Sequence, residues 1–286
     1  MVNFNSRLKD TRLHKFLLIG LFFSLVASCS GEKIDNGQVF RMPISNEPPT
    51  LDWSLATDSV SFDILTNIME GLTQYDSNME PIPAIAKRWV ISKNGKIITY
   101  YLRDDVFWTD GESVTAHDFE YSWKRLLNPA TAAQYAYFLF DVENAQEFNS
   151  GKISDPSKVG VSAKTDHILE VRLKKPVVYF PSITTFMVTF PQRKDIVEKF
   201  GDHWTDPENI VTNGPFKLSA WEHEYKLILT ANENFYEGRP PLDTILAYVI
   251  REKTTALTLY ETGELEMVEL PPVAIPHFKN HDEYEN

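Results

Sequence analysis

Cysteine is scarce in this sequence: the 286 residues contain one, Cys29. A single cysteine cannot form an intramolecular disulfide or supply a cysteine-rich zinc site. Basic residues are also few, since 28 Lys and Arg face 40 Asp and Glu and give a formal charge of −12. Phosphate recognition needs clustered Lys and Arg, so this balance argues against nucleic acid as a partner. With 43% hydrophobic residues, the chain is able to bury a core, as one large domain or two small ones.

The long apolar run near the N-terminus covers residues 16–27 and follows four basic residues, Arg7, Lys9, Arg12 and Lys15. It is shorter than the ~20 residues that a spanning helix needs, so it is typical of a secretory signal. Small residues precede Cys29, an arrangement that resembles the lipobox of bacterial lipoproteins. We therefore predict a lipoprotein signal peptide over 1–28, a lipid on the Cys29 thiol and a tether over 29–37. An uncleaved anchor helix, or a signal with an incidental cysteine, is the alternative.

The spacing of apolar residues predicts both strands and helices after the tether. Predicted strands lie at 97–102, 168–173, 217–221 with 225–231 as a hairpin, 244–249 and 264–270. Predicted helices lie at 61–72 and 253–262, with Gly263 ending the second, and a third begins at Thr115. There Asp118 takes the place of the Glu or Gln of a capping box. Strands that alternate with helices indicate an α/β fold.

Six stretches match, in order, a family of known proteins. They are Asn46–Asp52 with Ala56–Asp58, Glu70–Leu72, Trp108–Phe119, Phe200–Trp204, Ile210–Phe216 and Tyr260–Glu266. Over these stretches the chain resembles the oligopeptide-binding lipoproteins of ABC importers, which are extracytoplasmic solute-binding proteins of the peptide/nickel type (family 5). The matches fall only on the N-terminal portion of that family.

The resemblance implies a type II periplasmic-binding-protein-like fold, in which two α/β lobes enclose a ligand cleft. Residues 38–75 and 197–286 then form the main subdomain of lobe one, and 76–196 form an inserted α/β subdomain. The second lobe is missing, so the chain looks C-terminally truncated. The acidic residue with which the family pairs the peptide amino terminus therefore has no counterpart here. We expect weak or absent peptide affinity for this 286-residue form.

By the same resemblance, Thr57, Asp58 and Ser59 align with the strand that pairs with the ligand main chain, and Tyr135 aligns with a tyrosine that contacts it. Main-chain pairing gives affinity without reading side chains. A plain surface loop over 57–59 and a half-buried packing tyrosine are the alternatives. The implied function is capture of oligopeptides, as the extracytoplasmic substrate-binding component of an ABC importer in the bacterial cell envelope. The implied partners are the permease subunits with their ATPase, and the membrane through a lipid on Cys29; no cofactor is implied.

Other functions stay open on the sequence. A peptide-sensing lipoprotein not coupled to import, or a binder of dipeptides, nickel or haem, would use the same family fold. An envelope hydrolase is disfavoured, because G-x-S-x-G, H-E-x-x-H and P-loop motifs are missing from the sequence. Carboxylate pairs such as Asp104-Asp105 acquire catalytic meaning only from their separation in space. His277 and His281, with Glu283 and Glu285 nearby, have a helical metal-binding spacing, but an acidic chain end explains them as well, so no metal site is predicted.

Overall fold

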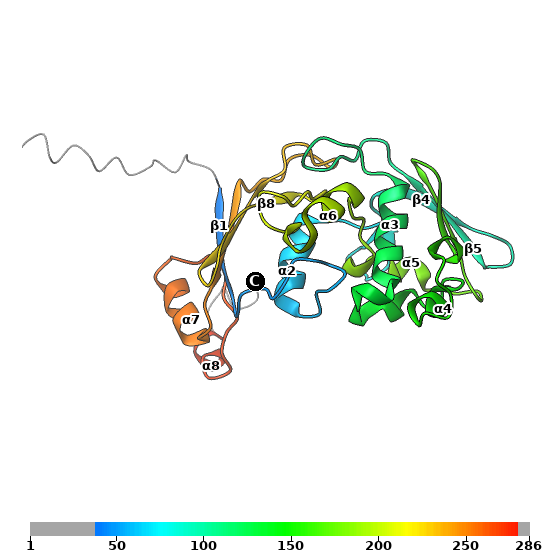
Figure 1. Cartoon of the computed structure of the whole chain (residues 1–286). Coiled ribbons are helices and arrows are strands. Elements are labelled where there is room, and N and C mark those ends of the chain that lie inside the picture. The colour runs from blue at the N-terminus through cyan, green and yellow to red at the C-terminus, as the bar shows by residue number, and fades with distance from the viewer. Residues whose placement is uncertain (1–37, 280–286) are drawn as a thin grey trace, which may run out of the picture. The chain divides into compact units, whose positions relative to one another are not determined.

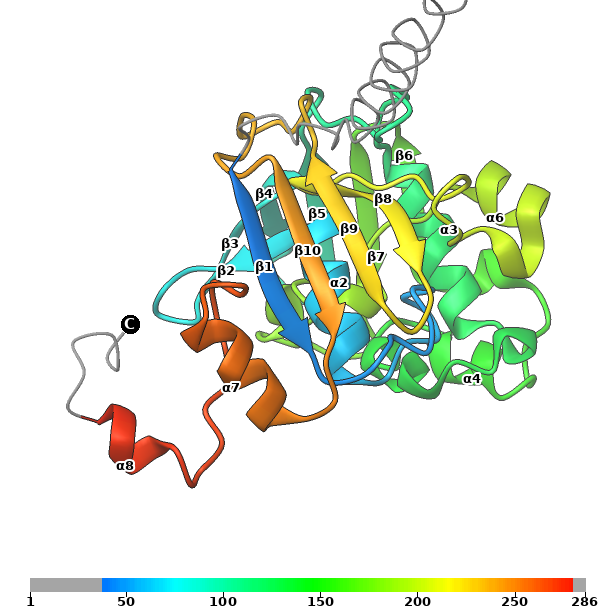
Figure 2. The ribbon, with the colours of Figure 1, turned by 90° about the vertical axis from the view of Figure 1, so that its left-hand side faces the viewer.

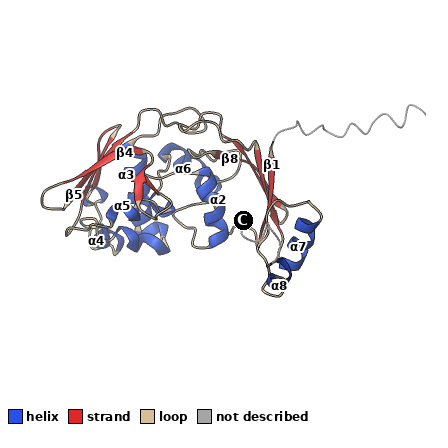
Figure 3. Ribbon diagram, turned by 180° about the vertical axis from the view of Figure 1, so that it is seen from behind, coloured by secondary structure: helices blue, strands red, loops and turns tan. Residues whose placement is uncertain are grey.

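The structure is a computed structural model that describes residues 38–279. The strands are β1 Val39–Ile44, β2 Thr73–Tyr75, β3 Pro81–Pro83, β4 Ala86–Ile91, β5 Ile97–Leu102, β6 Val161–Thr165, β7 Ile168–Arg172, β8 Phe216–Glu222, β9 Lys226–Ala231 and β10 Thr244–Val249. The α-helices are α2 Ser59–Ile68, α3 Ala116–Leu127, α4 Ala145–Asn149, α5 Phe180–Ile183, α6 Lys194–Phe200, α7 Lys253–Glu261 and α8 Ile275–Phe278. Short 3-10 helices are η1 Pro129–Thr131, η2 Gln134–Leu139, η3 Pro156–Lys158, η4 Met187–Thr189 and η5 Gly201–His203. Strands and helices alternate (Figures 1 and 3), which confirms the predicted α/β class.

One sheet joins segments from both ends of the described chain. Its strand order is β1-β10-β9-β8, with β1 parallel to β10 and the other neighbours antiparallel. Strand β9 buries Leu227, Leu229 and Ala231, every second residue, because successive side chains of a strand point to opposite faces. Helix α2 packs against β8 and lies behind this sheet in Figure 2. The predicted hairpin and the predicted strand 244–249 are confirmed.

A second sheet has the strand order β4-β5-β7-β6 and is antiparallel throughout. Strand β5, which the β-branched and aromatic residues of 97–102 predict, buries Ile98, Tyr100 and Leu102 in alternation. Helix α3 contacts β6 and β7, so one side of the sheet is covered by a helix (Figure 1). This sheet and α3 bury a large aromatic side chain, Trp123, whose indole N–H donates to the Thr189 carbonyl at 2.7 Å.

Helix α3 begins where the sequence predicts. The Asp118 carboxylate accepts hydrogen bonds from the Thr115 backbone N–H at 2.8 Å and from the Thr115 hydroxyl at 3.0 Å. These bonds satisfy donors that a helix start otherwise leaves unpaired. Burial raises the pKa of Asp118 above its ordinary value, although the hydrogen bonds from Thr115 oppose the shift. An aspartate therefore does serve in this capping position.

Helix α2 ends at Ile68, four residues before the predicted end. Met69 has extended backbone angles (φ −134°, ψ 153°), and the Glu70 N–H donates to the Asn213 side-chain oxygen at 2.9 Å. The Gly214 N–H donates to the Ile68 carbonyl at 2.9 Å. The returning segment before β8 thus supplies partners to the last turn of α2, so the helix ends through contacts distant in sequence.

The predicted strand over 264–270 is wrong, because the structure has no strand there. One residue of this stretch does reach the open edge of β1: the Glu266 N–H donates to the Arg41 carbonyl at 3.0 Å. However, the Glu266 carboxylate accepts from the Arg41 N–H at 2.5 Å and from the Arg41 guanidinium at 2.6 Å. The side chain takes the N–H that a neighbouring strand would use, so the ladder does not extend.

The carboxyl group of Glu70 lies where the chain leaves α2 for the second sheet. It accepts a hydrogen bond from the Tyr236 hydroxyl at 2.9 Å, and the Arg103 guanidinium lies 4.6 Å from the centre of the Tyr236 ring. Burial raises the pKa of Glu70 to about 7, and the Glu237 charge adds to this, while the Tyr236 hydrogen bond and Arg103 oppose it. The pKa of Tyr236 is raised as well, first by burial and then by the Glu70 charge.

We expect the stability of the protein to fall as the pH rises through the titration of Glu70. The folded pKa of Glu70 is about 7 and its ordinary value is 4.5, so folding takes up a proton between these pH values. A full conversion of the pKa shift would give ~1.4 kcal/mol of unfolding free energy for each pKa unit. Because the Glu70 carboxyl keeps some solvent contact, we expect a smaller loss of stability, about 2 kcal/mol between pH 4.5 and 8. Urea unfolding of wild type and Glu70→Gln across this range measures it. Parallel pH profiles of the two proteins would contradict the assignment.

Candidate functional site

The loop over residues 45–58, between β1 and α2, carries two of the predicted ligand-binding residues and is held by a buried ion pair. The Arg125 guanidinium donates to both Asp52 carboxylate oxygens, at 2.9 and 2.6 Å. The Asp52 carboxylate also accepts from the Trp204 indole N–H at 3.3 Å and from the Ser54 N–H at 3.0 Å. The Asp52 and Arg125 side chains are 8% and 18% exposed, so solvent screens this pair little. The loop is therefore fixed to α3 and to the segment after α6.

A second layer of polar contacts supports the same loop. The Gln192 side chain donates from its amide nitrogen to the Ser54 hydroxyl at 3.1 Å and accepts from Arg125 at 3.4 Å. Beside it, the Trp53 ring packs edge-on against Trp204, with 4.7 Å between the ring centres. Because Gln192, Ser54 and Trp53 are buried, these contacts are shielded from water and hold one arrangement of the loop.

The start of the loop is tied to the β8–β9 hairpin through Glu47. Its carboxylate accepts from the Trp221 indole N–H at 2.7 Å, from His223 at 2.5 Å and from the Glu224 N–H at 3.1 Å. Burial raises the pKa of Glu47, but the hydrogen bonds from His223, Glu224 and Trp221 outweigh it and the net pKa is lowered. The loop is thus anchored near its start by Glu47 and near its middle by Asp52.

The segment Thr57-Asp58-Ser59 is only partly extended. Asp58 has strand-like angles (φ −117°, ψ 156°), while Ser59 is the first residue of α2. The Asp58 carboxylate caps this helix by accepting from the Ser61 N–H at 2.9 Å and from the Ser61 hydroxyl at 2.8 Å. The structure therefore corrects the strand that the resemblance implied here to a short extended stretch followed by a helix start. The role of Thr57, Asp58 and Ser59 in ligand binding stays a prediction.

Tyr135, the other predicted ligand-binding residue, lies beside this segment. It belongs to η2 and is half-buried, and its hydroxyl donates to the Thr57 carbonyl at 3.3 Å. The two residues are 78 positions apart in sequence, so the fold brings together a tyrosine and a backbone segment that the resemblance placed at one site. A contact role of Tyr135 toward a ligand stays a prediction.

Four further aromatic rings surround Tyr135, and none of them was predicted as a site residue. They come from α2, η2 and the turn before η4, and each is half-buried or exposed. We call these five rings the aromatic cluster: Phe62, Tyr135, Tyr137, Phe138 and Phe186. Tyr137 and Phe138 are close to Tyr135 in sequence and belong to the same short helix η2. Phe62 and Phe186 gave no local signal, because their contact with the others depends on tertiary structure.

A cavity of about 280 Å³ lies beside Ser59. It is lined by the last residues of β1, the first residues of α2, and residues from 250–256 and 267–269. Burial raises the pKa of Asp63 in this lining, and the Asp58 charge adds to the shift. Lys253 forms an ion pair with Glu269, so the lining carries both signs of charge. More than half of the lining residues are apolar, so the cavity offers both charged and apolar contacts.

Several predictions concern residues outside the described range. Cys29, the signal over 1–28 and the tether lie outside it, as do His281, Glu283 and Glu285. Within residues 38–279, no group of three His, Cys, Asp or Glu side chains is placed to bind a metal ion. Every helix found in that same range is too short or too polar to cross a bilayer.

Solved structures share this fold. The substrate-binding domain of an oligopeptide ABC transporter from Bacillus anthracis superposes with a TM-score of 0.82 at 36% identity, over 88% of this chain and 49% of that one. The fold is therefore the N-terminal part of a type II periplasmic-binding-protein-like architecture, which confirms the predicted fold class.

The chain belongs to the bacterial extracellular solute-binding proteins, family 5 (middle), whose family model matches residues 80–286. The dipeptide-binding protein DppE of Bacillus subtilis is 33% identical over 268 residues, which are 89% of this chain and 49% of that protein. The periplasmic oligopeptide-binding protein OppA of Salmonella typhimurium is 37% identical over 208 residues, 72% of this chain and 38% of that protein. The chain spans about half or less of the curated relatives it matches.

Proposed function

We propose that this chain forms the first lobe of an extracytoplasmic substrate-binding protein that captures oligopeptides for an ABC importer. The observation that carries the proposal is the 3.3 Å hydrogen bond from the Tyr135 hydroxyl to the Thr57 carbonyl. It sets a tyrosine ring beside extended backbone at the start of α2. An extended peptide is bound through such backbone groups and a rigid ring that offers both an apolar face and a hydroxyl.

In this proposal the ligand main chain lies along Thr57 to Ser59. The first N–H groups of a helix have no intrahelical partner, so the start of α2 offers donors next to the extended stretch. Water that bridges polar groups of the mixed-charge cavity to the ligand lets different side chains be accepted. The ligand is held and released without covalent change, so the proposed activity is binding and not catalysis.

The domain division proposed for this chain follows its two four-stranded sheets, while the two-stranded sheet β2-β3 spans the boundary at 75/76. All four strands of the sheet β1-β10-β9-β8 fall within 38–75 and 197–286, the proposed main subdomain. All four strands of the sheet β4-β5-β7-β6 fall within 76–196, the proposed inserted subdomain. The boundary at 196/197 falls inside α6, so this helix belongs to the connection between them.

We propose lipid attachment at Cys29 as the means of holding the protein at the membrane, where permease subunits and their ATPase would be its partners. The support is the lipobox-like sequence before Cys29. We expect wild type in the membrane fraction and Cys29→Ser in the soluble fraction of a bacterial host. Mass spectrometry of the N-terminal peptide is expected to show a lipid on Cys29. An unmodified Cys29 thiol in membrane-bound wild type would rule the anchor out.

Main-chain recognition predicts that the purified chain binds trialanine weakly. It also predicts that trialanine with methylated peptide N–H groups does not bind. One lobe supplies one wall, so we expect a Kd on the order of 1 mM, equivalent to about −4 kcal/mol. Ligand-observed NMR titration measures both peptides, and the N-methylated peptide is the matched control. The sequence left weak and absent affinity both open, and the proposed site requires weak binding. The proposal fails if trialanine gives no saturation transfer, or if both peptides bind alike. Submicromolar binding would contradict the expectation that one lobe binds weakly.

Dipeptides are the alternative ligand, favoured by the name of the DppE relative. The same titration with dialanine separates the two. If the site recognises main-chain groups along several residues, trialanine binds more tightly than dialanine because it offers more of them. Equal or tighter binding of dialanine would favour the dipeptide alternative.

A further inference from the structure

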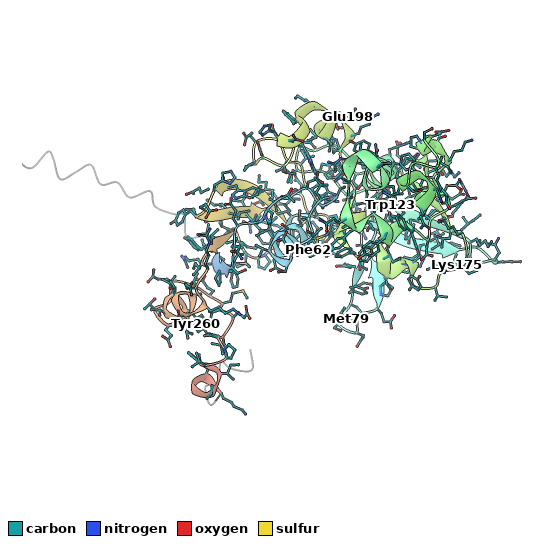
Figure 4. All side chains as sticks on the ribbon, turned by 60° about the horizontal axis from the view of Figure 1, so that its bottom comes forward. Phe62, Met79, Trp123, Lys175, Glu198 and Tyr260 are labelled. Carbon is teal, nitrogen blue, oxygen red and sulfur yellow. The ribbon has the colours of Figure 1, made fainter. Side chains whose placement is uncertain are left out.

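The aromatic cluster is a surface of five uncharged rings on a chain with an excess of acidic residues. Four of its rings, those of Phe62, Tyr135, Phe138 and Phe186, pack on the core with part of each left exposed, and Phe62 is labelled in Figure 4. The fifth ring, Tyr137, is 53% exposed. Tyr137 therefore extends the four half-buried rings out to the protein surface, where a ligand is able to contact them.

The rings contact one another closely enough to form one surface. The centre of the Tyr135 ring lies 6.3 Å from that of Phe62, 5.9 Å from Tyr137, 5.7 Å from Phe138 and 5.9 Å from Phe186. The other ring centres are 5.6 Å apart for Phe62–Phe186, 4.7 Å for Tyr137–Phe138 and 4.8 Å for Phe138–Phe186. Tyr137 and Phe138 are stacked, with 25° between their planes, whereas Tyr135 meets both edge-on. The cluster is therefore held together by ring contacts and presents both ring faces and ring edges.

We propose that the aromatic cluster is a specificity surface that selects peptides with an aromatic or large aliphatic side chain at one position. The inference rests on the proposed function, because it needs the ligand main chain at Thr57 to Ser59. The link is Tyr135, which belongs to the cluster and whose hydroxyl bonds to the Thr57 carbonyl at 3.3 Å. A ligand residue beside Thr57 would thus have the cluster next to its side chain. Ring faces and edges attract aromatic side chains in stacked and edge-on geometries.

Only one position of the ligand is selected, for a geometric reason. Successive side chains of an extended peptide point to opposite sides. If one side chain lies on the aromatic cluster, those of its neighbours point away from it. The mixed-charge cavity beside Ser59 then lies along the same main chain and offers charges of both signs to other parts of the ligand. The selected ligand is a peptide with one bulky apolar residue at a defined place, and not an apolar molecule in general.

The test compares Phe-Ala-Ala, Ala-Phe-Ala and Ala-Ala-Phe with trialanine, each titrated into the purified 286-residue chain by ligand-observed NMR. We expect one of the three to bind about tenfold more tightly than trialanine, with the strongest saturation transfer to its ring protons. The variant Tyr137→Ser should bring the ratio of the two affinities close to one. The matched control is Tyr225→Ser, which removes another tyrosine that is 53% exposed and lies outside the cluster, and it should leave the ratio unchanged.

Every other outcome shows that the specificity surface is wrong, or that both it and the proposed function are wrong. If all three phenylalanine peptides bind like trialanine, and N-methylation still abolishes trialanine binding, the specificity surface is wrong and the proposed function stands. The specificity surface is also wrong if the preference survives Tyr137→Ser, is lost equally in Tyr225→Ser, or is the same at all three positions. If no peptide binds, the specificity surface and the proposed function are both wrong.

Discussion

Replacing Asp52 with alanine is expected to lower the free energy of unfolding by about 3–5 kcal/mol. The substitution removes both carboxylate acceptors of the Arg125 guanidinium, whose side chain is only 18% exposed. The partly buried cation then keeps only its 3.4 Å hydrogen bond to Gln192. The substitution also removes the acceptor of the Trp204 indole and of the Ser54 N–H. Urea unfolding followed by tryptophan fluorescence measures the loss, because Trp53 and Trp204 lie in this network.

Two further variants separate the buried charge from a general loss of contacts. The exposed pair Arg103–Asp105 is the control, with side chains 34% and 56% exposed, and Asp105→Ala is expected to cost about 0–1 kcal/mol. The double variant Asp52→Ala/Arg125→Met removes the unpaired cation and should regain part of the stability. A loss of less than about 1 kcal/mol for Asp52→Ala would show that this network does not fix the loop.

Gly214→Ala is expected to cost about 3 kcal/mol of stability. A Cβ at position 214 would lie 2.5 Å from the Ile68 carbonyl carbon, 2.6 Å from the Met69 nitrogen and 2.8 Å from the Ile68 oxygen. These are backbone atoms at the end of α2, so no side chain can move aside. The shift needed would also break the hydrogen bond from the Gly214 N–H to Ile68, 2.9 Å long. Thermal and urea unfolding measure the effect.

Gly151→Ala is the matched control for this contact. Gly151 has a positive φ of 74°, but a Cβ there would meet nothing within 4 Å. Its substitution therefore costs only the strain of left-handed backbone, about 1–2 kcal/mol. A cost for Gly214→Ala no larger than that for Gly151→Ala would contradict the close approach of the returning segment to α2.

Local patterns were sufficient to predict strands whose faces differ in burial. The predicted strands 97–102 and 244–249 coincide with β5 and β10, and the β-branched and aromatic residues of 97–102 are typical of a strand. The end of α2 and the stretch 264–270 were predicted wrongly for one common reason. Asn213 and Gly214 end the helix, and Arg41 engages the side chain of Glu266, all from distant parts of the chain. No local pattern contains such contacts.

The candidate site also contains some residues that could be predicted from the sequence and others that could not. Thr57 and Tyr135 could be named in advance only because the sequence resembles a family, and the structure then placed them in contact. The ion pair behind the loop could not be predicted, since Arg125 is 73 residues and Trp204 is 152 residues from Asp52. The aromatic cluster was missed for the same reason: its members are ordinary apolar residues until tertiary structure brings them together.

The pairing of β1 with β10 has a consequence for the order of assembly of this chain. Gln38, just before β1, contacts Asp243, just before β10, across 205 residues. A ribosome makes the chain from its N-terminus, so the strand made first has no neighbour until almost the whole described chain exists. The β8–β9 hairpin closes a short loop and needs no such wait. Pro43 within β1 lacks an N–H, and the charge of Arg41 lies on the same strand, and both features discourage pairing with other chains during that interval.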